Sequence, residues 1–186
     1  MKLLNILLII FISLTNEIKA DSKQLQILDI LQKGGNLIFI RHAYAPGGGD
    51  PENFKISDCS TQRNLNDSGR VQSKNIGNFF KEHKIPIDLV ISSEWCRCKE
   101  TANIAFKNFE TKNFLNSFYS KQFAKNKKIQ IKKLRKYIDN WKSDKNLVLI
   151  THYVLISELL DYAPSSGEIV IANKDFKKIG NFEIEY

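Results

Sequence analysis

The chain has 186 residues, a length that suits one compact domain and leaves little room for two. Apolar residues make up 42% and charged residues 26%, which excludes a wholly disordered protein and one embedded in a membrane along most of its length. The formal net charge of +8 permits anionic partners.

The first 20 residues differ in character from the rest. Lys2 provides a positive start, ten of the twelve residues from Leu3 to Leu14 are apolar, and a polar stretch leads to Ala20. This layout predicts a secretory signal peptide at residues 1–20, cleaved near Ala20, and a mature protein that is periplasmic or secreted. The alternative is an uncleaved membrane anchor, for which the apolar stretch is short, because a span needs about 20 residues. We expect residues 21–186 to form one domain.

Strands and helices alternate after this segment. Short continuous apolar runs, typical of buried parallel strands, are followed by stretches with helical periodicity. The predicted strands are residues 37–40, 88–91, 146–150, 169–172 and 182–186, and the predicted helices are residues 22–32, 66–83, 95–109, 120–142 and 154–160. The pattern predicts an α/β domain: a three-layer sandwich in which a mostly parallel sheet carries helices on both faces.

One predicted helix carries much of the positive charge. Eight Lys and Arg residues lie between Lys121 and Lys136, with no acidic residue among them. Clustered cations can follow a phosphate backbone, but Ile131, Leu134 and Ile138 recur here at helical spacing. We therefore predict the solvent-exposed face of a packed helix and no nucleic-acid partner. A weak contact with an anionic envelope surface is the other interpretation.

The three cysteines are Cys59, Cys96 and Cys98. A Cys-x-Cys pair with one distant cysteine is a poor zinc pattern, so we predict no metal site. Export would permit a disulfide. We predict that Cys59 is bonded to Cys96 or to Cys98, with one thiol left free, and the sequence does not choose between the two partners.

Three predicted strands end near side chains that suit an anion. Arg41 and His42 follow the first strand, Arg97 comes shortly after the second, and His152 follows the third. Ligands of open α/β sheets bind beyond the carboxyl ends of the strands, and nearby helix N-termini favour negative charge. We expect these two guanidinium groups and two imidazole rings to surround one tetrahedral oxyanion, such as phosphate.

Four segments in this order carry a family resemblance. Residues 41–43 (Arg-His-Ala) are similar to an Arg-His-Gly signature, with alanine in place of glycine, and residues 63–73 to an Arg-x-Leu-Thr-x-x-Gly-x-x-Gln-Ala block. Residues 92–102 resemble a Ser-Ser-x-x-x-Arg-Ala-x-x-Thr-Ala element, and His152 stands where a second histidine is expected. Together these segments resemble the histidine phosphatase superfamily, which has the phosphoglycerate-mutase-like fold.

The resemblance implies a phosphatase that forms a phosphohistidine on His42. Arg41, Arg97 and His152 would bind the phosphate, and no metal or other cofactor would be needed, because the arginines supply positive charge. The substrate would be a phosphomonoester, either a small molecule or a group linked to a polysaccharide. The alternatives are a non-catalytic anion-binding module of the same fold and a basic protein that binds the envelope surface.

The motifs leave the proton donor for the leaving oxygen unassigned. Many family members have a glutamate some way after the second arginine, where this chain has residues 114–118 (Phe-Leu-Asn-Ser-Phe). The acid that follows the second histidine in phytase-like members is replaced by Tyr153. Glu94, or Asp50 and Glu52 in the glycine-rich loop, are the candidates. A substrate with a good leaving group, such as an acyl phosphate or phosphohistidine, would need no strong acid.

Overall fold

The computed structural model describes residues 25–185, so the predicted signal peptide lies outside the described part. Residues 25–33 are helical. Among residues 25–185, no helix is both long and apolar enough to cross a membrane.

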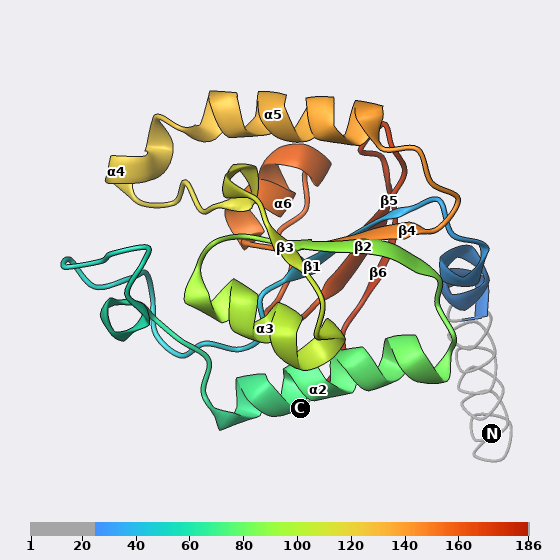
Figure 1. Ribbon diagram of the computed structural model, residues 1–186, viewed down its shortest axis with the longest axis horizontal. Coiled ribbons are helices and arrows are strands. Elements are labelled where there is room, and N and C mark those ends of the chain that lie inside the picture. The colour runs from blue at the N-terminus through green and yellow to red at the C-terminus, as the bar shows by residue number, and fades with distance from the viewer. Residues whose placement is uncertain (1–24, 186) are drawn as a thin grey trace, which may run out of the picture.

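Six strands form one mixed sheet in the order β3-β2-β4-β1-β5-β6 (Figure 1). They are β1 (Leu37–Arg41), β2 (Ile87–Ser92), β3 (Glu110–Thr111), β4 (Asn146–Thr151), β5 (Ile169–Ala172) and β6 (Lys178–Phe182). The strands β3, β2, β4 and β1 are parallel, whereas β5 and β6 pair antiparallel. The α/β class with a largely parallel sheet is therefore confirmed, and its parallel part brings the ends of β1, β2 and β4 to the same edge.

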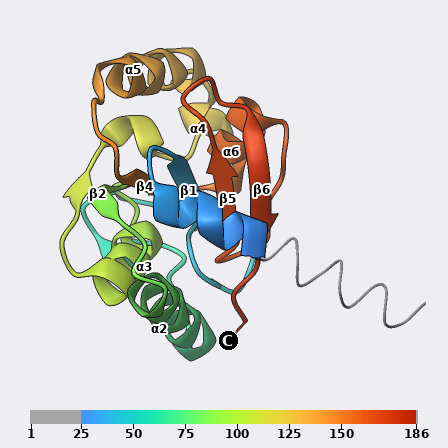
Figure 2. The same ribbon diagram turned by 90° about the vertical axis from the view of Figure 1, so that its right-hand side faces the viewer.

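Helices cover both faces of this sheet (Figure 2). The α-helices are α2 (Asp67–Glu82), α3 (Cys96–Phe106), α4 (Lys121–Ala124), α5 (Lys127–Asn140) and α6 (Tyr153–Leu160), and two 3₁₀-helices are η1 (Cys59–Thr61) and η2 (Asn113–Leu115). Helices α2 and α3 lie on one face, and α5 and α6 on the other (Figure 1).

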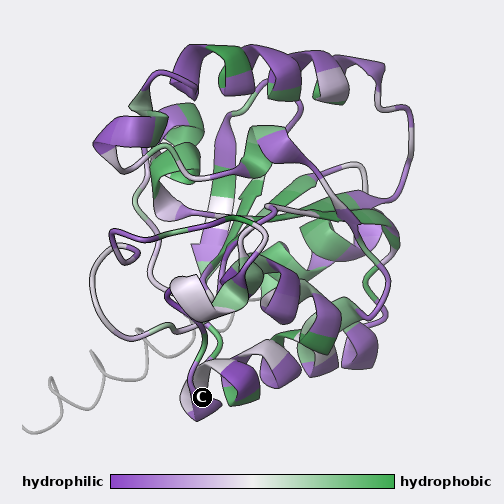
Figure 3. Cartoon of the chain, turned by 60° about the vertical axis from the view of Figure 1, so that its left-hand side comes forward, coloured by the Kyte–Doolittle hydropathy of each residue, from purple (hydrophilic) through white to green (hydrophobic). Residues whose placement is uncertain are grey.

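The central strand β1 shows why the sheet needs both layers. Its side chains alternate between the two hydrophobic clusters: Leu37 and Phe39 face the α5–α6 side, and Ile38 and Ile40 face the α2–α3 side. All four are fully buried. Figure 3 shows the corresponding pattern, with hydrophobic strands inside and largely hydrophilic helix surfaces outside.

Helix α2 begins where the sequence predicts. The Oδ1 atom of Asn66 accepts a hydrogen bond from the Gly69 backbone N–H at 2.9 Å, as an N-cap does. At Gly69 the helix approaches the loop after β1 so closely that a β-carbon would lie 2.0 Å from the Tyr44 carbonyl oxygen. Val71, which helical spacing predicts to face inward, is 48% exposed, whereas its neighbour Gln72 is buried.

The predicted boundaries fail in three places. The single helix expected at residues 120–142 is divided into α4 and α5. The helix expected at residues 95–109 ends at Phe106, because Lys107 adopts a φ of +66° that an α-helix does not allow. The last strand is β6 and not residues 182–186.

Candidate active site

The parallel strands end at a cavity of about 340 Å³. All four predicted phosphate-site residues line it: Arg41 ends β1, His42 follows directly, Arg97 lies in the first turn of α3, and His152 is the N-cap residue of α6. The ring centroids of the two histidines are 5.5 Å apart. Residues distant in sequence are thus brought together as expected.

The hydrogen bonding of His42 determines which ring nitrogen is available for chemistry. Its Nδ1 atom lies 2.9 Å from the backbone oxygen of Ala43. Because a carbonyl oxygen only accepts, Nδ1 carries the proton and Nε2 keeps its lone pair. The ring is 2% exposed, and burial, followed by the charge of Arg97, holds the pKa of His42 well below its usual value. His42 is therefore a neutral imidazole with an unprotonated Nε2.

Three guanidinium groups, not two, belong to the cavity. Arg63, which was not among the predicted site residues, lines it together with Arg41 and Arg97. Arg97 Nη1 donates a hydrogen bond to the Arg63 backbone oxygen at 3.2 Å, and burial, followed by the charge of Arg97, lowers the pKa of Arg63. Arg63 begins the second motif segment, which was the available signal. We call Arg41, Arg63 and Arg97 the arginine triad.

Each member of the arginine triad has an unsatisfied donor. Arg41 donates from Nη1 to the Pro164 carbonyl at 2.9 Å, and Arg63 donates from Nη1 to the Ala45 carbonyl. The Nε atoms of all three are buried and have no hydrogen-bond partner among residues 25–185. An unmade hydrogen bond of a buried donor costs about 1–3 kcal/mol, so an anion in the cavity would be stabilised by these groups.

Asp50 lies in the cavity but is occupied by other residues. Its carboxylate accepts hydrogen bonds from Arg97 at 2.7 and 3.1 Å, from Trp95 Nε1 at 3.0 Å and from the Arg63 backbone N–H at 3.0 Å. Burial opposes ionisation, but these bonds and the charge of Arg97 keep the pKa of Asp50 below its usual value. Asp50 is therefore ionised and is a poor proton donor.

The other two candidate acids do not reach the cavity. Glu94 lines a neighbouring cavity of about 330 Å³, and its carboxylate accepts a hydrogen bond from Asn116 Nδ2 at 2.6 Å. Glu52 is exposed and lies in a turn of the loop outside the cavity lining. The prediction that Glu94 serves as general acid is thus corrected, because it points to Asn116 and not to the phosphate site.

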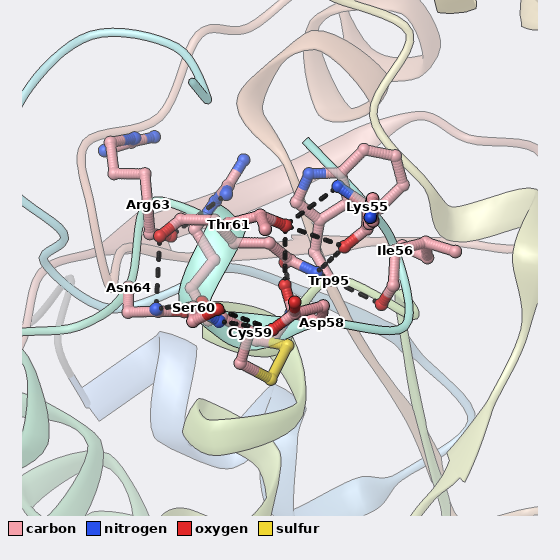
Figure 4. The surroundings of a disulfide bond; sticks show 12 residues. Lys55, Ile56, Asp58, Cys59, Ser60, Thr61, Arg63, Asn64 and Trp95 are labelled. Carbon is pink, nitrogen blue, oxygen red and sulfur yellow. Dashed lines mark hydrogen bonds between the residues drawn. A yellow bond between two sulfur atoms is a disulfide. The ribbon is translucent and has the colours of Figure 1, made fainter. Parts of the chain in front are cut away.

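A disulfide joins Cys59 to Cys96 (Figure 4). The free thiol is therefore that of the buried Cys98. The disulfide connects η1 to the first residue of α3, which directly precedes Arg97. The loop is held further by stacking of Phe54 on Trp95, with ring centroids 5.0 Å apart. The disulfide and this stacking fix the loop that carries Asp50 and Arg63 against the cavity.

Tyr119 and Tyr153, which were not among the predicted site residues, also line the cavity. Their ring centroids are 5.9 Å apart, and Tyr119 is 61% exposed. Tyr153 lies beneath the Arg41 guanidinium, whose carbon is 5.2 Å from the ring centroid.

Among residues 25–185, no group of three or more His, Cys, Asp or Glu side chains is placed to hold a metal ion.

Solved structures share this fold. The chain is similar to the protein histidine phosphatase SixA complexed with tungstate, with 17% identity, a TM-score of 0.54, and coverage of 81% of this chain and 96% of that one. It is similar to TTHB049 from Thermus thermophilus, with 12% identity, a TM-score of 0.57 and coverage of 81% and 99%. It is also similar to the open reading frame Rv3214 from Mycobacterium tuberculosis, with 15% identity, a TM-score of 0.53, and coverage of 73% of this chain and 89% of that one. These likenesses concern the fold.

Sequence comparison places the chain in a family. No curated protein matches it. The family model of the histidine phosphatase superfamily (branch 1) matches residues 37–146, more than half of the chain. That span begins at β1 and contains His42, the arginine triad and the disulfide. Fold, motif order and family model agree, and the chain belongs to the histidine phosphatase superfamily.

Proposed function

We propose that this phosphatase hydrolyses phosphomonoesters through a phosphohistidine on Nε2 of His42. The observation that carries the proposal is the hydrogen bond from His42 Nδ1 to the Ala43 carbonyl, which leaves the Nε2 lone pair free beside the arginine triad. A neutral imidazole held in this way is a competent nucleophile.

In the proposed reaction, Nε2 attacks phosphorus as the bond to the leaving oxygen breaks, and water then cleaves the phosphorus–nitrogen bond. Arg41, Arg97 and His152 hold the phosphoryl oxygens and stabilise the charge that spreads over them. The guanidinium groups supply the positive charge, so we propose that no metal is needed. Support comes from the SixA structure, which holds tungstate, a tetrahedral oxyanion like phosphate.

The leaving group limits the choice of substrate. Among residues 25–185, the carboxylate lining the cavity is that of Asp50, which is ionised and bound to Arg97. We therefore propose phosphoryl groups with good leaving groups, such as acyl phosphates or phosphohistidine, as better substrates than alkyl phosphates. The proposed substrate classes are small-molecule phosphomonoesters and phosphate groups linked to envelope polysaccharide, with those that have good leaving groups preferred.

We also propose that the protein acts outside the cytoplasm. The predicted signal peptide at residues 1–20 supports export, and the Cys59–Cys96 disulfide suits an oxidising compartment. N-terminal sequencing of the protein from a cell-envelope or culture fraction should give Asp21 as the first residue. A cytoplasmic protein that begins at Met1 would contradict this proposal.

A non-catalytic anion-binding module is the second candidate, favoured by the lack of a free acid in the described part of the cavity. To separate the two, residues 21–186 are supplied with p-nitrophenyl phosphate and a chelator between about pH 5 and 8, a range that spans the usual histidine pKa. We expect turnover that His42→Ala abolishes and His83→Ala retains, since His83 lies outside the cavity lining. Vanadate binding without turnover would instead establish the binding module.

A further inference from the structure

A chain of polar side chains leads from His152 away from the cavity. His152 Nε2 lies 3.0 Å from Ser93 Oγ, and Ser93 Oγ lies 3.1 Å from Asn116 Oδ1. Asn116 Nδ2 in turn lies 2.6 Å from the carboxylate of Glu94. Ser93 and His152 are buried, and the two outer residues are partly buried. The direction of each hydrogen bond in this chain follows from its outer end.

Glu94 fixes the orientation of the Asn116 amide. The Glu94 backbone N–H donates to Oδ1 of Asn116 at 2.9 Å, while the Glu94 carboxylate accepts from Nδ2. The reversed amide would place two donors together at one end and two acceptors together at the other. The atom that faces Ser93 is therefore an oxygen, which only accepts, and the Ser93 hydroxyl donates its single proton to Asn116.

Ser93 is then left with acceptor capacity only. Its oxygen accepts from the Trp95 backbone N–H at 3.3 Å and has a second lone pair directed at His152 Nε2. If the proton pointed to His152 instead, the oxygens of Ser93 and Asn116 would lie 3.1 Å apart with no hydrogen between them. The arrangement that satisfies every group places the His152 proton on Nε2.

The remaining neighbour of Nε2 is consistent with this assignment. The Sγ atom of Cys98 lies 3.5 Å from His152 Nε2 and 3.7 Å from the Thr151 carbonyl oxygen. Burial raises the pKa of Cys98 to about 12, so the group is a thiol and its proton can point to Thr151. The sulfur then presents a lone pair to the Nε2–H of His152.

We propose that Ser93, oriented by Asn116 and Glu94, is a positioning residue that keeps the His152 proton on Nε2 and presents the Nδ1 lone pair to the phosphoryl group. This inference rests on the proposed function. Nδ1 makes no capping hydrogen bond to α6, and the ring lines the cavity. The Nδ1 lone pair and a phosphoryl oxygen are both acceptors, so they can form a hydrogen bond only if a proton lies between them. The site therefore binds the phosphomonoester as its monoanion, which carries that proton.

The proton balance gives this proton a role in the reaction. The bond from His42 Nε2 to phosphorus forms, the bond to the leaving oxygen breaks, and the leaving oxygen takes the proton that entered with the phosphoryl group. Water then attacks phosphorus and releases His42. One proton of this water takes the place of the transferred proton between His152 Nδ1 and the phosphoryl oxygen, and phosphate leaves as the monoanion. The net reaction converts ester monoanion and water into alcohol and dihydrogen phosphate. The proton carried by the substrate is thus the one available to the leaving oxygen, so the site still favours leaving groups that need little protonation.

The charges around His152 explain why the lone pair is free before the ligand arrives. Burial, followed by Arg97, His42 and the rest of the arginine triad, holds the pKa of His152 well below its usual value. The one carboxylate lining the described cavity, that of Asp50, is bound to Arg97. An incoming anion offsets the guanidinium charge, and proton binding at Nδ1 becomes favourable at that moment.

The first test reads the tautomer directly and needs no ligand or turnover. In ¹⁵N-labelled wild type at about pH 8, where histidine is normally neutral, long-range proton–nitrogen spectra should show His152 with its proton on Nε2. The His152 signals are identified by their loss in His152→Asn. Ser93→Ala should lose the fixed Nε2–H pattern, whereas Ser92→Ala should keep it, because the Ser92 hydroxyl donates to the Ser93 carbonyl at 2.9 Å and not to His152.

The second test measures the proton taken up. Phenylphosphonate cannot be hydrolysed, and above its second pKa it is a dianion without a proton. Its affinity for wild type should fall about tenfold per pH unit there, because the complex holds one proton more than its free components. In Ser93→Ala the slope should flatten, since His152 can then carry its proton on Nδ1 and donate directly.

A wild-type His152 protonated on Nδ1, or a wild-type affinity that is flat with pH, overturns the inference even if Ser93→Ala does not fold. Failure of the proposed function is a separate result: wild type would bind phenylphosphonate with the expected slope and yet leave p-nitrophenyl phosphate intact.

Discussion

In the cavity, three guanidinium groups from distant parts of the chain meet below the surface, whereas the eight cations of residues 121–136 follow one another along α4 and α5. The arginine triad is buried or partly buried, and burial, with a smaller contribution from the charge of Arg97, lowers the pKa values of Arg41 and Arg63. The cations of α5 are mostly exposed, and Lys127 pairs with Glu158. Charges brought together in space, away from solvent screening, mark a binding site better than charges that are merely close in sequence.

Exchanging one arginine in each region gives the largest expected effect. Arg97→Ala should lower kcat for p-nitrophenyl phosphate about 10²–10³-fold, because one group that stabilises the transferring phosphoryl oxygens is lost. Arg135→Ala removes the same side chain from the exposed region, where it lies over the Phe176 ring, and should change kcat less than about twofold. Equal effects in steady-state assays would contradict the distinction between the two regions.

Opening the disulfide tests how the buried region is held together. The Cys59–Cys96 bond closes a segment of 37 residues, and the double variant Cys59→Ser, Cys96→Ser should lose about 2–4 kcal/mol of unfolding free energy in urea titrations. A reducing agent should bring wild type down to the level of the double variant and leave that variant unchanged. A wild type indifferent to reductant would show that the bond contributes nothing.

Acid should lower the unfolding free energy through the two buried histidines. His42 and His152 have lowered pKa values in the folded protein, while the unfolded chain binds their protons near the usual pKa of about 6.5. The unfolded state therefore gains protons first, and the unfolding free energy should fall below that pH with a slope approaching about 2.7 kcal/mol per pH unit for two protons. In His42→Asn the slope should be about half as steep. An unchanged slope would mean that His42 is not the group that titrates.

Neutralising the exposed region should have the smallest effect on chemistry. We expect the triple change of Lys132, Lys133 and Lys136 to glutamine to leave kcat within about twofold of wild type, because exposed charges are screened and lie outside the cavity lining. Adsorption to anionic vesicles in a sedimentation assay should weaken if these lysines face an envelope surface. A kcat loss comparable to that of Arg97→Ala would show that the exposed lysines contribute to turnover as much as the arginine triad does.

The sequence predicted the elements that depend on local patterns. The apolar runs of β1, β2 and β4, the start of α2 and the alternation of strands and helices all follow from side-chain periodicity and capping chemistry. Because parallel strands end at one edge, the convergence of His42, Arg97 and His152 was also predictable. The choice of Cys96 over Cys98 was not, because both belong to the start of α3 and only the rotation of that helix separates them.

What remained hidden depended on side-chain direction across chain segments. Glu94 follows the same strand as Ser93, but Asn116 draws its carboxylate toward the neighbouring cavity, and nothing local to Glu94 indicates this. Arg63 lies in the site because the glycine-rich loop folds back, which lets the Arg63 backbone N–H donate a hydrogen bond to the Asp50 carboxylate. The break between α4 and α5 likewise has no glycine or proline to announce it.

Helix α2 meets the loop after β1 at Gly69, a position outside the cavity lining. Even alanine at this position would press on the Tyr44 carbonyl, two residues from His42, so we expect the strain to reach the ring that is proposed to accept phosphate. A single methyl group outside the cavity lining would thus disturb the backbone next to His42. We therefore expect Gly69→Ala to lower the unfolding free energy and, under the proposed function, also the activity that depends on His42.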